Sequence, residues 1–430
     1  MASQTKIPSF YNGWLPSTKA VHKAFLKKLH GVAHGPHRAR ASHNPAVEKF
    51  AEAIKSSPIM VELFDNIFLQ QAQIPELEHQ PENLDMLLYM IDPIVISPPM
   101  FLTSVEDAGQ PVGVPLYLLF DLLSNTSAGY DLFRMPAFNV ALKELLDSWG
   151  AYLQTEDSNK TLNEGPDGWF SKAAITALED LRGDFNSTYV VPNPNAENRG
   201  YMSWDAFFCR QVLKAARPVD APDNQALIHN ACESTVYNIA RNVKLHDQFW
   251  LKTQAYSLYD MLNGAADNGK LAEQFVGGTV YQAFLSPVDY HRWHTPIDGT
   301  IEKIEVLPGT YYAALPDEGD PSLGDRAPSG ALIRSQAWLT MSAARALFYI
   351  RAANPKIGLV CFIAVGMAEV STCFVTSTVG KAVKTGDELG MFRFGGSSHA
   401  LIFQEQANVQ FFDNVVTDQH LKVNSIIAHV

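Results

Sequence analysis

The residues best suited to covalent chemistry are Gly395-Gly396-Ser397-Ser398. A serine that follows two glycines has an open backbone, so its hydroxyl can reach the carbonyl carbon of the preceding residue. Attack by Ser397 on Gly396 would convert the peptide bond into an ester. Elimination and hydrolysis would then leave a pyruvoyl group, an electrophile made from the chain itself. The same tetrapeptide also describes an ordinary flexible turn, so it needs support from other parts of the chain.

Two histidines and one acid could supply acid–base groups. His291 and His294 lie in the stretch Tyr290-His291-Arg292-Trp293-His294-Thr295-Pro296, and Glu233 lies in Ala231-Cys232-Glu233-Ser234. Free imidazole titrates near about 6.5, which suits proton transfer at neutral pH. A carboxylate can orient such an imidazole, as the acid of a serine triad does.

Other interpretations of these three residues stay open. The histidines could bind a metal or fill a polar turn, and Glu233 could be a salt-bridged residue of a strand edge. Pro287 and Pro296 bracket the histidines and make a long helix improbable, and no third ligand follows at a metal-site spacing. We therefore expect no metal site.

Several common catalytic motifs do not occur in the sequence. It contains no GxSxG, HExxH, GxxxxGK[ST] or GxGxxG pattern. No lysine stands beside a convincing phosphate cradle, so we expect no pyridoxal phosphate.

Glu233, His291, His294 and Gly396-Ser397 together resemble the phosphatidylserine decarboxylase family of pyruvoyl enzymes. The matching motifs cover roughly residues 203–430 in the order of that family. Over nearly the whole chain, the sequence is also similar to the fungal L-tryptophan decarboxylases of psilocybin biosynthesis and related basidiomycete aromatic amino-acid decarboxylases. The chain departs from the phospholipid enzymes in two places: Ser398 replaces their threonine, and Glu233 replaces the aspartate of their PADG-like strand. The motifs that carry the resemblance are Phe207-Phe208-Cys209-Arg210, Arg217-Pro218-Val219, the Tyr290–Gly299 stretch and Gly386–Ser398.

The resemblance implies two successive uses of one site. During maturation, His294, oriented by Glu233, would take the proton of Ser397. Cleavage between Gly396 and Ser397 would give a β chain of residues 1–396 and an α chain of 430 − 396 = 34 residues. During turnover, the substrate amine would form a Schiff base with the pyruvoyl group, which acts as the electron sink. His291 would protonate the product carbon or position the substrate, with His294 as the rival donor.

The expected substrate is a free aromatic L-amino acid, with conversion of L-tryptophan to tryptamine as the leading reaction. Trp293 or Trp338 could stack on its ring, and Ser398 is expected as a hydrogen-bonding neighbour. The stretch Leu315–Met341 is either a lid or a solvated loop. A phosphatidylserine decarboxylase is the first alternative function, and an uncleaved, non-catalytic binding protein is the second.

These residues must be positioned by an α+β fold. Helical patterns dominate residues 16–155, for example at Leu84–Ile91, and Val, Ile, Tyr and Thr become frequent from residue 225 onward. After Ser203, a plausible N-cap, one more helix is expected to run to about Ala216. We predict a helical N-terminal domain over residues 1–195 and a pyruvoyl-decarboxylase domain over residues 196–430. The expected strands are Glu233–Ile239, Thr279–Leu285, Gly299–Val306, Ile357–Val365 and Val370–Val375.

The composition limits the possible partners. A net charge of −12 and a pI near 5.5 argue against nucleic acid or an anionic membrane as the main partner. Neither a hydrophobic signal region nor a run of eighteen apolar residues occurs, so we expect a cytoplasmic protein without a membrane anchor. The expected partners are a small amino acid and the α and β chains of one precursor, and a homo-oligomer is left open.

Overall fold

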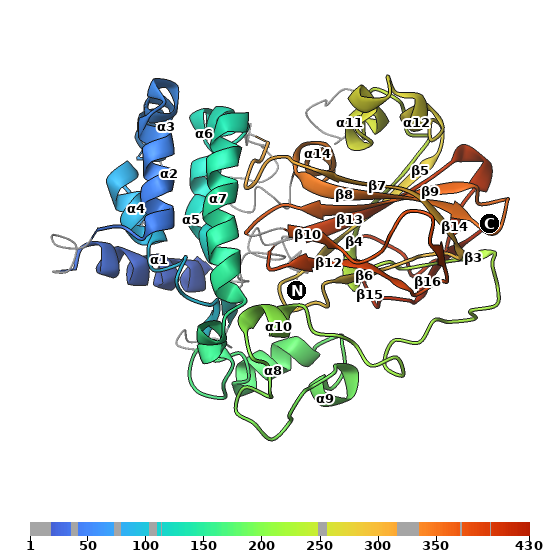
Figure 1. The fold of residues 1–430 in the computed structure, drawn as a ribbon, viewed down its shortest axis with the longest axis horizontal. Coiled ribbons are helices and arrows are strands. Elements are labelled where there is room, and N and C mark those ends of the chain that lie inside the picture. Colours follow the sequence, from blue (N-terminus) through green and yellow to red (C-terminus); the bar gives the residue numbers. More distant parts are fainter. Residues whose placement is uncertain are drawn as a thin grey trace, which may run out of the picture.

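The chain folds as a helical half beside a β-rich half (Figure 1). The computed structural model describes residues 19–35, 42–72, 79–102, 110–112, 114–247, 256–315, 335–369, 372–395 and 397–430. The expected α+β class is confirmed, because the helices come first and an antiparallel sheet system follows.

The helices begin where capping residues allow them to begin. The side chain of Asn44 accepts a hydrogen bond from the amide of Ala46 at the start of α2, and Asn83 accepts one from Met86 at the start of α4. The helices are α1 (Lys19–Ala33), α2 (Pro45–Lys55), α3 (Pro58–Gln71), α4 (Leu84–Ile91), α5 (Pro115–Ser124), α6 (Ser127–Leu132), α7 (Pro136–Leu153), α8 (Lys172–Glu179), α9 (Phe185–Thr188), α10 (Trp204–Phe208), α11 (Leu258–Met261), α12 (Lys270–Glu273) and α14 (Gln336–Ser342).

The strands form one large antiparallel sheet and three small ones. The large sheet has the order β11-β7-β8-β9-β13-β5-β4-β15, so β13 is a central strand. The small sheets are β10-β12-β6, β14-β16-β3 and β1-β2. The strands are β1 (Met100–Leu102), β2 (Gln110–Val112), β3 (Leu227–His229), β4 (Ser234–Arg241), β5 (Thr279–Leu285), β6 (Arg292–His294), β7 (Gly299–Leu307), β8 (Ala344–Ala352), β9 (Leu359–Gly366), β10 (Thr372–Val375), β11 (Ala382–Val383), β12 (Glu388–Arg393), β13 (Ser397–Phe403), β14 (Gln410–Phe411), β15 (His420–Leu421) and β16 (Ile426–His429).

Strand β13 contributes to two hydrophobic cores, one on each face of the large sheet. Ala400 and Ile402 belong to the core that the sheet shares with the helical half. Leu401 and Phe403 belong to the core on the opposite face. This division follows from the alternation of side chains along a strand, and it means that neighbouring residues of β13 meet different surroundings.

A buried acid ties the two halves together. Helix α5 begins after Val114, which makes no side-chain cap. Instead, Oε1 of Glu369, just beyond the end of β9, accepts a hydrogen bond of 2.8 Å from the amide of Tyr117. Glu369 is fully buried, and its φ of 58° lies in the left-handed region, so tertiary contacts hold it in a costly conformation.

Most predicted elements are present, with two corrections. The helix expected to run to Ala216 ends at Phe208, because the following residues form turns that place Arg210 and Arg217 in the interior. The five expected strands also leave out several that the structure contains, among them β8 and β13. The domain boundary after residue 195 stays a prediction. None of the helices in the described residues is long and apolar enough to cross a membrane.

Candidate active site

Ser397 is the first residue of β13, where it lies between Gly366 of β9 and Leu285 of β5. Its side chain is 1% exposed, and its Oγ has no hydrogen-bond partner among the described residues. A buried hydroxyl without a partner is costly, which makes it a candidate for a reactive group. Gly396, the other half of the predicted cleavage bond, lies outside the described residues.

Ser398 points to the opposite face of the sheet. Its Oγ lies 3.4 Å from Nε2 of Gln282 and 3.7 Å from the sulfur of Met367. The two adjacent serines therefore meet different neighbours, and of their two hydroxyls only that of Ser397 lacks a partner in the part of the chain that the structure describes.

His291 is fully buried, and neither of its ring nitrogens has a partner among the described residues. The ring stacks on Phe208 with the centroids 4.0 Å apart. Burial lowers the pKa of His291 to about 3, so the imidazole is neutral at physiological pH.

Two backbone contacts bring His291 into the region of Ser397. The segment that leads to His291 begins directly after Leu285, the residue paired with Ser397. The carbonyl of His291 accepts a hydrogen bond of 2.9 Å from the amide of Phe392 in β12, the strand that precedes Ser397. The structure thus joins these two predicted site residues through short stretches of chain.

His294 is held by one partner at each ring nitrogen. Nδ1 lies 2.7 Å from the carbonyl oxygen of Gly386, and Nε2 lies 2.9 Å from the hydroxyl of Tyr290. Because a carbonyl can only accept, Nδ1 carries the proton and Nε2 accepts from Tyr290. Burial is the main cause that lowers the pKa of His294. The ring is therefore a neutral base with a defined tautomer.

The predicted contact between Glu233 and His294 is not formed. Glu233 is fully buried and accepts from Arg217 at both carboxylate oxygens, with Nη2–Oε1 at 2.5 Å and Nε–Oε2 at 2.7 Å. The amide of Val423 also donates to Oε2 at 3.2 Å. The buried guanidinium of Arg217 needs a bidentate acceptor, and Glu233 supplies it. Glu233 is connected to His294 only through the backbone, since the amide of His294 donates to the carbonyl of Ala231 at 2.8 Å.

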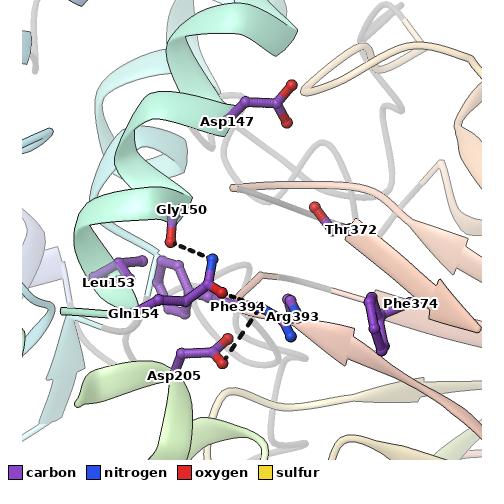
Figure 2. A pocket seen from close by; sticks show the side chains of 9 residues that line it. All are labelled: Asp147, Gly150, Leu153, Gln154, Asp205, Thr372, Phe374, Arg393 and Phe394. Carbon is purple, nitrogen blue, oxygen red and sulfur yellow. Dashed lines mark hydrogen bonds and ion pairs between the residues drawn. The ribbon is translucent and has the colours of Figure 1, made fainter. Parts of the chain in front are cut away.

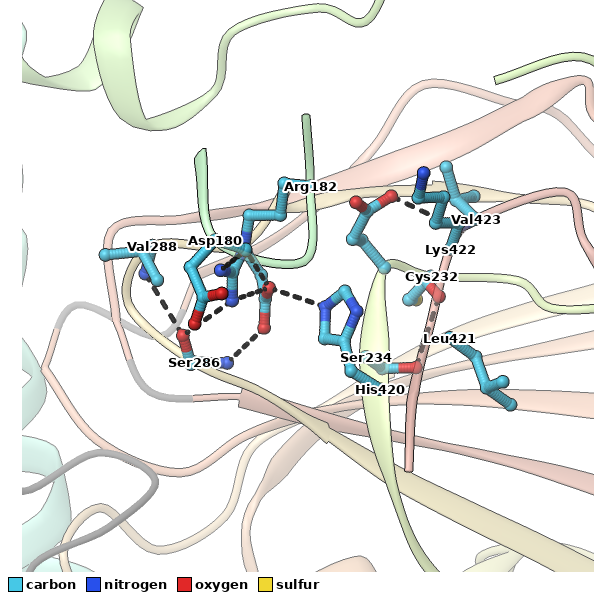
Figure 3. A network of polar contacts seen from close by, with 12 residues as sticks. Asp180, Arg182, Cys232, Ser234, Ser286, Val288, His420, Leu421, Lys422 and Val423 are labelled. Atoms are coloured by element: carbon cyan, nitrogen blue, oxygen red, sulfur yellow. Dashed lines mark hydrogen bonds and ion pairs between the residues drawn. The ribbon is translucent and has the colours of Figure 1, made fainter. Parts of the chain in front are cut away.

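Sequence reasoning missed a buried acid beside the histidines. Asp289 accepts from Nε of Arg182 at 2.7 Å, from the amide of Ser286 at 2.7 Å and from Nε2 of His420 at 3.0 Å. Figure 3 shows Arg182, Ser286 and His420 close together in this network of polar contacts. Burial alone would raise the pKa of Asp289, but Arg182 and His420 hold it well below its usual range. The signal that could have revealed it is a lone acid directly before Tyr290-His291.

Sequence reasoning also missed a buried histidine on the same strand as Ser397. His399 lies two residues after Ser397 on the same face of β13, and its Nε2 is 3.1 Å from Oγ of Ser234. Its Nδ1 has no partner among the described residues, and burial lowers its pKa to about 3. The only signal in the sequence was that His399 stands two positions after Ser397, a spacing that puts both side chains on one face of a strand.

Of the two predicted aromatic contacts, Trp293 needs correction. Its ring is fully buried in the core beneath the large sheet, between Phe392 at 4.9 Å, Phe362 at 5.8 Å and Phe348 at 6.1 Å. It is a core residue in this structure and offers no surface to a substrate. Trp338 is partly buried on α14, 6.4 Å from the ring of Tyr130, and its contact with substrate stays a prediction. Most of the predicted lid, residues 316–334, lies outside the described residues.

A metal site is another interpretation of the two histidines. Within the part of the chain that the structure describes, no group of three or more His, Cys, Asp or Glu side chains could hold a metal ion.

Comparison with known proteins places this geometry in context. Residues 204–429 match the family described as phosphatidylserine decarboxylase, and residues 44–178 match a second model of the same description. Decarboxylase iboD of Amanita muscaria is 59% identical over 79% of this chain and 99% of its own length. The L-tryptophan decarboxylase of Psilocybe cubensis is 31% identical over 98% of this chain and 94% of its own length. The phosphatidylserine decarboxylase proenzyme 3 of Schizosaccharomyces pombe is 28% identical over 53% of this chain and 21% of its own length.

Proposed function

Because this chain belongs to the phosphatidylserine decarboxylase family, we propose that it is a pyruvoyl-dependent decarboxylase of a free aromatic L-amino acid. The leading reaction is the conversion of L-tryptophan to tryptamine. The observation that carries the proposal is the Ser397 hydroxyl, which is buried at the start of a central strand and has no partner within the described part of the chain. A pyruvoyl group formed there would supply an electrophilic carbonyl for the substrate amine and an electron sink for decarboxylation.

The maturation step would need only the residues of the chain and one water molecule. Ser397 Oγ attacks the carbonyl carbon of Gly396, and the peptide C–N bond breaks as the ester C–O bond forms. Elimination breaks the bond between Oγ and Cβ of Ser397 and releases the carboxylate of Gly396. Hydrolysis of the resulting dehydroalanine consumes water, releases ammonia and leaves the ketone.

His294 would be the base in maturation. Its Nε2 carries the lone pair, now satisfied by the Tyr290 hydroxyl. The carbonyl of Gly386 fixes the tautomer of His294. The family resemblance implies that Glu233 would orient this ring. Glu233 would be a positioning residue, because its pairing with Arg217 fixes the segment whose carbonyl, at Ala231, holds the amide of His294.

His291 would act during turnover. Neither ring nitrogen is paired with a described residue, so the neutral imidazole can hold or deliver a proton once a substrate provides a partner. Its stacking on Phe208 fixes the plane of the ring.

We prefer the free amino acid to the lipid because the two kinds of relative match different shares of this chain. The similarity to the Psilocybe L-tryptophan decarboxylase includes the helical half, whereas the similarity to the lipid-acting proenzyme spans about half of this chain. Phosphatidylserine decarboxylation is the second candidate. An uncleaved binding protein is the third.

Mass spectrometry of the purified protein tests the proposal. We expect a 34-residue fragment, residues 397–430, that begins with a pyruvoyl group, and its loss in Ser397→Ala. The matured protein is then incubated with tryptophan, phenylalanine, tyrosine and phosphatidylserine. Release of carbon dioxide from the lipid alone would favour the second candidate, and an uncleaved wild-type chain would favour the third.

A further inference from the structure

A tight turn joins the end of β5 to the segment that carries His291. The amide of Ser286 donates to the carboxylate of Asp289 at 2.7 Å, and the amide of Asp289 donates back to the carbonyl of Ser286 at 3.0 Å. The turn starts directly after Leu285, the residue paired with Ser397. Its closure therefore fixes the path by which the chain leads from the neighbour of Ser397 to His291.

The carboxylate of Asp289 receives donors from three separate parts of the chain. Besides the amide of Ser286, Nε of Arg182 donates from the loop after α8 at 2.7 Å, and Nε2 of His420 lies 3.0 Å away in β15. An ionised carboxylate can only accept hydrogen bonds, so Nε2 of His420 is the donor in this contact. The exposed fractions of the His420 and Asp289 side chains are 6% and 0%, which leaves water little access to the contact.

Arg210 holds the backbone of the same turn. Its Nη2 donates to the carbonyl of Val288 at 2.9 Å and to that of Asp289 at 3.2 Å. The guanidinium lies 4.2 Å from the centre of the Tyr189 ring. Asp289 is therefore fixed both at its side chain and at its backbone, two residues before His291.

The imidazole of His291 has no comparable polar anchor among the described residues. It stacks on Phe208 at 4.0 Å, and the ring of Phe394 lies 5.3 Å beyond Phe208. Phe394 lines the pocket drawn in Figure 2, together with the charged residues Asp205 and Arg393. Two aromatic rings thus separate these charges from His291, and the placement of its ring depends on the backbone that the turn holds.

His420 belongs to the segment that the proposed cleavage would separate from Asp289. Its strand β15 pairs with β4, and the amide of Val423 donates to Oε2 of Glu233 at 3.2 Å. Figure 3 shows His420 and Val423 on one stretch of chain beside the contacts of Arg182. The contact between His420 and Asp289 would therefore join the 34-residue α chain to the β chain.

We propose that His420 of the α chain is a positioning residue for turnover, which binds Asp289 and so holds the turn that places His291 beside the pyruvoyl group. This inference rests on the proposed function. The partner that Asp289 binds is a segment of the protein's own C-terminal fragment. The α chain would then have two roles, because it supplies the pyruvoyl group and supports the residue that handles the proton.

His420 can be changed more safely than Asp289. Loss of the carboxylate would leave the buried guanidinium of Arg182 without its anion, which is strongly destabilising. His420→Leu removes the donor to Asp289, whereas His420→Gln can offer a side-chain N–H at a similar position. His429→Leu is the matched control, because it makes the same substitution at an exposed histidine of the same fragment.

The first test measures turnover per matured chain. His420→Leu should lower kcat by about tenfold or more, since a small misplacement of a catalytic group is costly, while KM stays within about twofold. The 34-residue fragment should form at the wild-type yield and stay bound. His420→Gln should recover most of kcat, and His429→Leu should match the wild type.

Three results of this test would overturn the proposal. An unchanged kcat in His420→Leu would show that His291 does not depend on this contact. An equal loss in His420→Gln would show that the donor is not what matters. Release of the fragment from His420→Leu would show that His420 holds the two chains together and does not position His291.

The second test does not depend on catalysis. In the Ser397→Ala chain, which stays a single polypeptide, hydrogen exchange is followed by mass spectrometry in the peptide that spans residues 286–291. His420→Leu should speed this exchange by about tenfold, because one charge-assisted hydrogen bond to the turn is lost. His420→Gln and His429→Leu should leave it near the starting rate.

The two tests separate failure of this inference from failure of the proposed function. Unchanged exchange in His420→Leu would overturn the link between His420 and the turn, whatever reaction the protein catalyses. Failure of the proposed function would instead be seen in the wild-type protein, as a missing fragment or as no decarboxylation of any amino acid.

Discussion

Glu233 directs both carboxylate oxygens at the guanidinium of Arg217, and the exposed fractions of the two side chains are 0% and 3%. Arg217 also donates to the carbonyl of Arg182 at 2.9 Å, and Arg182 binds Asp289. Two buried ion pairs are therefore linked through one backbone carbonyl, between the loop after α8 and the strands that carry the candidate histidines. Loss of one partner would leave an uncompensated charge in a region that water does not reach.

Arg217→Met should destabilise the protein strongly. Removing one partner of a buried ion pair costs about 3–5 kcal/mol, because the charge that remains cannot be solvated. The free energy of unfolding is measured by urea titration in the Ser397→Ala background, so that every variant is a single polypeptide. Arg351→Met removes an arginine from an exposed pair, with exposed fractions of 45% and 44%, and should cost about 0–1 kcal/mol. Equal losses in the two variants would contradict the structural role of the Arg217–Glu233 pair.

Ser398→Ala should leave maturation intact. Its hydroxyl faces the opposite side of the sheet from Ser397, and its contacts with described residues are long, at 3.4 and 3.7 Å, so little free energy is lost with it. The yield and rate of the 34-residue fragment are followed by mass spectrometry. We expect a rate within about twofold of wild type, since no strong hydrogen bond is removed. An uncleaved Ser398→Ala chain would show that the second serine takes part in the chemistry.

The two histidines should separate maturation from turnover. His294→Asn should slow or stop cleavage, because it removes the base that the Gly386 carbonyl orients. His291→Asn should cleave normally, yet kcat should fall by about 10²–10⁴-fold, the usual contribution of a general acid or base. Fragment yield and carbon dioxide release per matured chain are the two measurements. Normal cleavage in His294→Asn together with blocked cleavage in His291→Asn would reverse the assignment.

The sequence predicts those elements whose signals are local. The β-branched and aromatic residues of Thr279–Leu285 predict β5 with the bounds that the structure has, and the apolar spacing of Leu84–Ile91 does the same for α4. Strand β8 follows α14 after a single residue, so no turn signal separates them. The alternation in Arg292-Trp293-His294 could not show which face would be the core, and the structure places Trp293 inside.

Within the site, motif residues were predictable and their partners were not. Ser397, His291 and His294 stand out through their types and spacing. Arg217 and Glu233 are 16 positions apart, and their contact depends on how the chain folds back between them. No sequence pattern in that stretch specifies this contact. His399 and Asp289 each lie beside a motif residue, but their importance comes from burial, which a single sequence does not reveal.

Stability should have a maximum near pH 6.5. Burial lowers the pKa values of His229, His291, His294 and His399 from 6.5, and for His291 and His399 the value falls to about 3. Below pH 6.5 the unfolded chain therefore binds more protons than the native one, and stability falls as the pH is lowered. Each histidine contributes at most about 1.4 kcal/mol per pH unit.

Glu369 acts in the opposite direction and determines how stability changes with pH above pH 6.5. Burial raises its pKa from 4.5 to about 8, so stability is lost as the pH rises through this range. His30 has a lowered pKa as well, and the pKa of Asp205 is raised like that of Glu369. Between pH 4.5 and 6.5 the histidines outnumber these two acids, and the acid loss dominates. Above pH 6.5 the effect of Glu369 remains, and the slope changes sign.

Urea titrations of the Ser397→Ala chain from pH 4.5 to 8 would measure this profile. His399→Gln should reduce the acid slope and leave the alkaline slope, because it removes one neutral buried imidazole. Glu369→Gln should flatten the alkaline slope alone, since the amide that replaces the carboxyl group does not titrate. If His399→Gln left the acid slope unchanged and Glu369→Gln left the alkaline slope unchanged, the protonation of these two buried groups would not govern the pH dependence of stability.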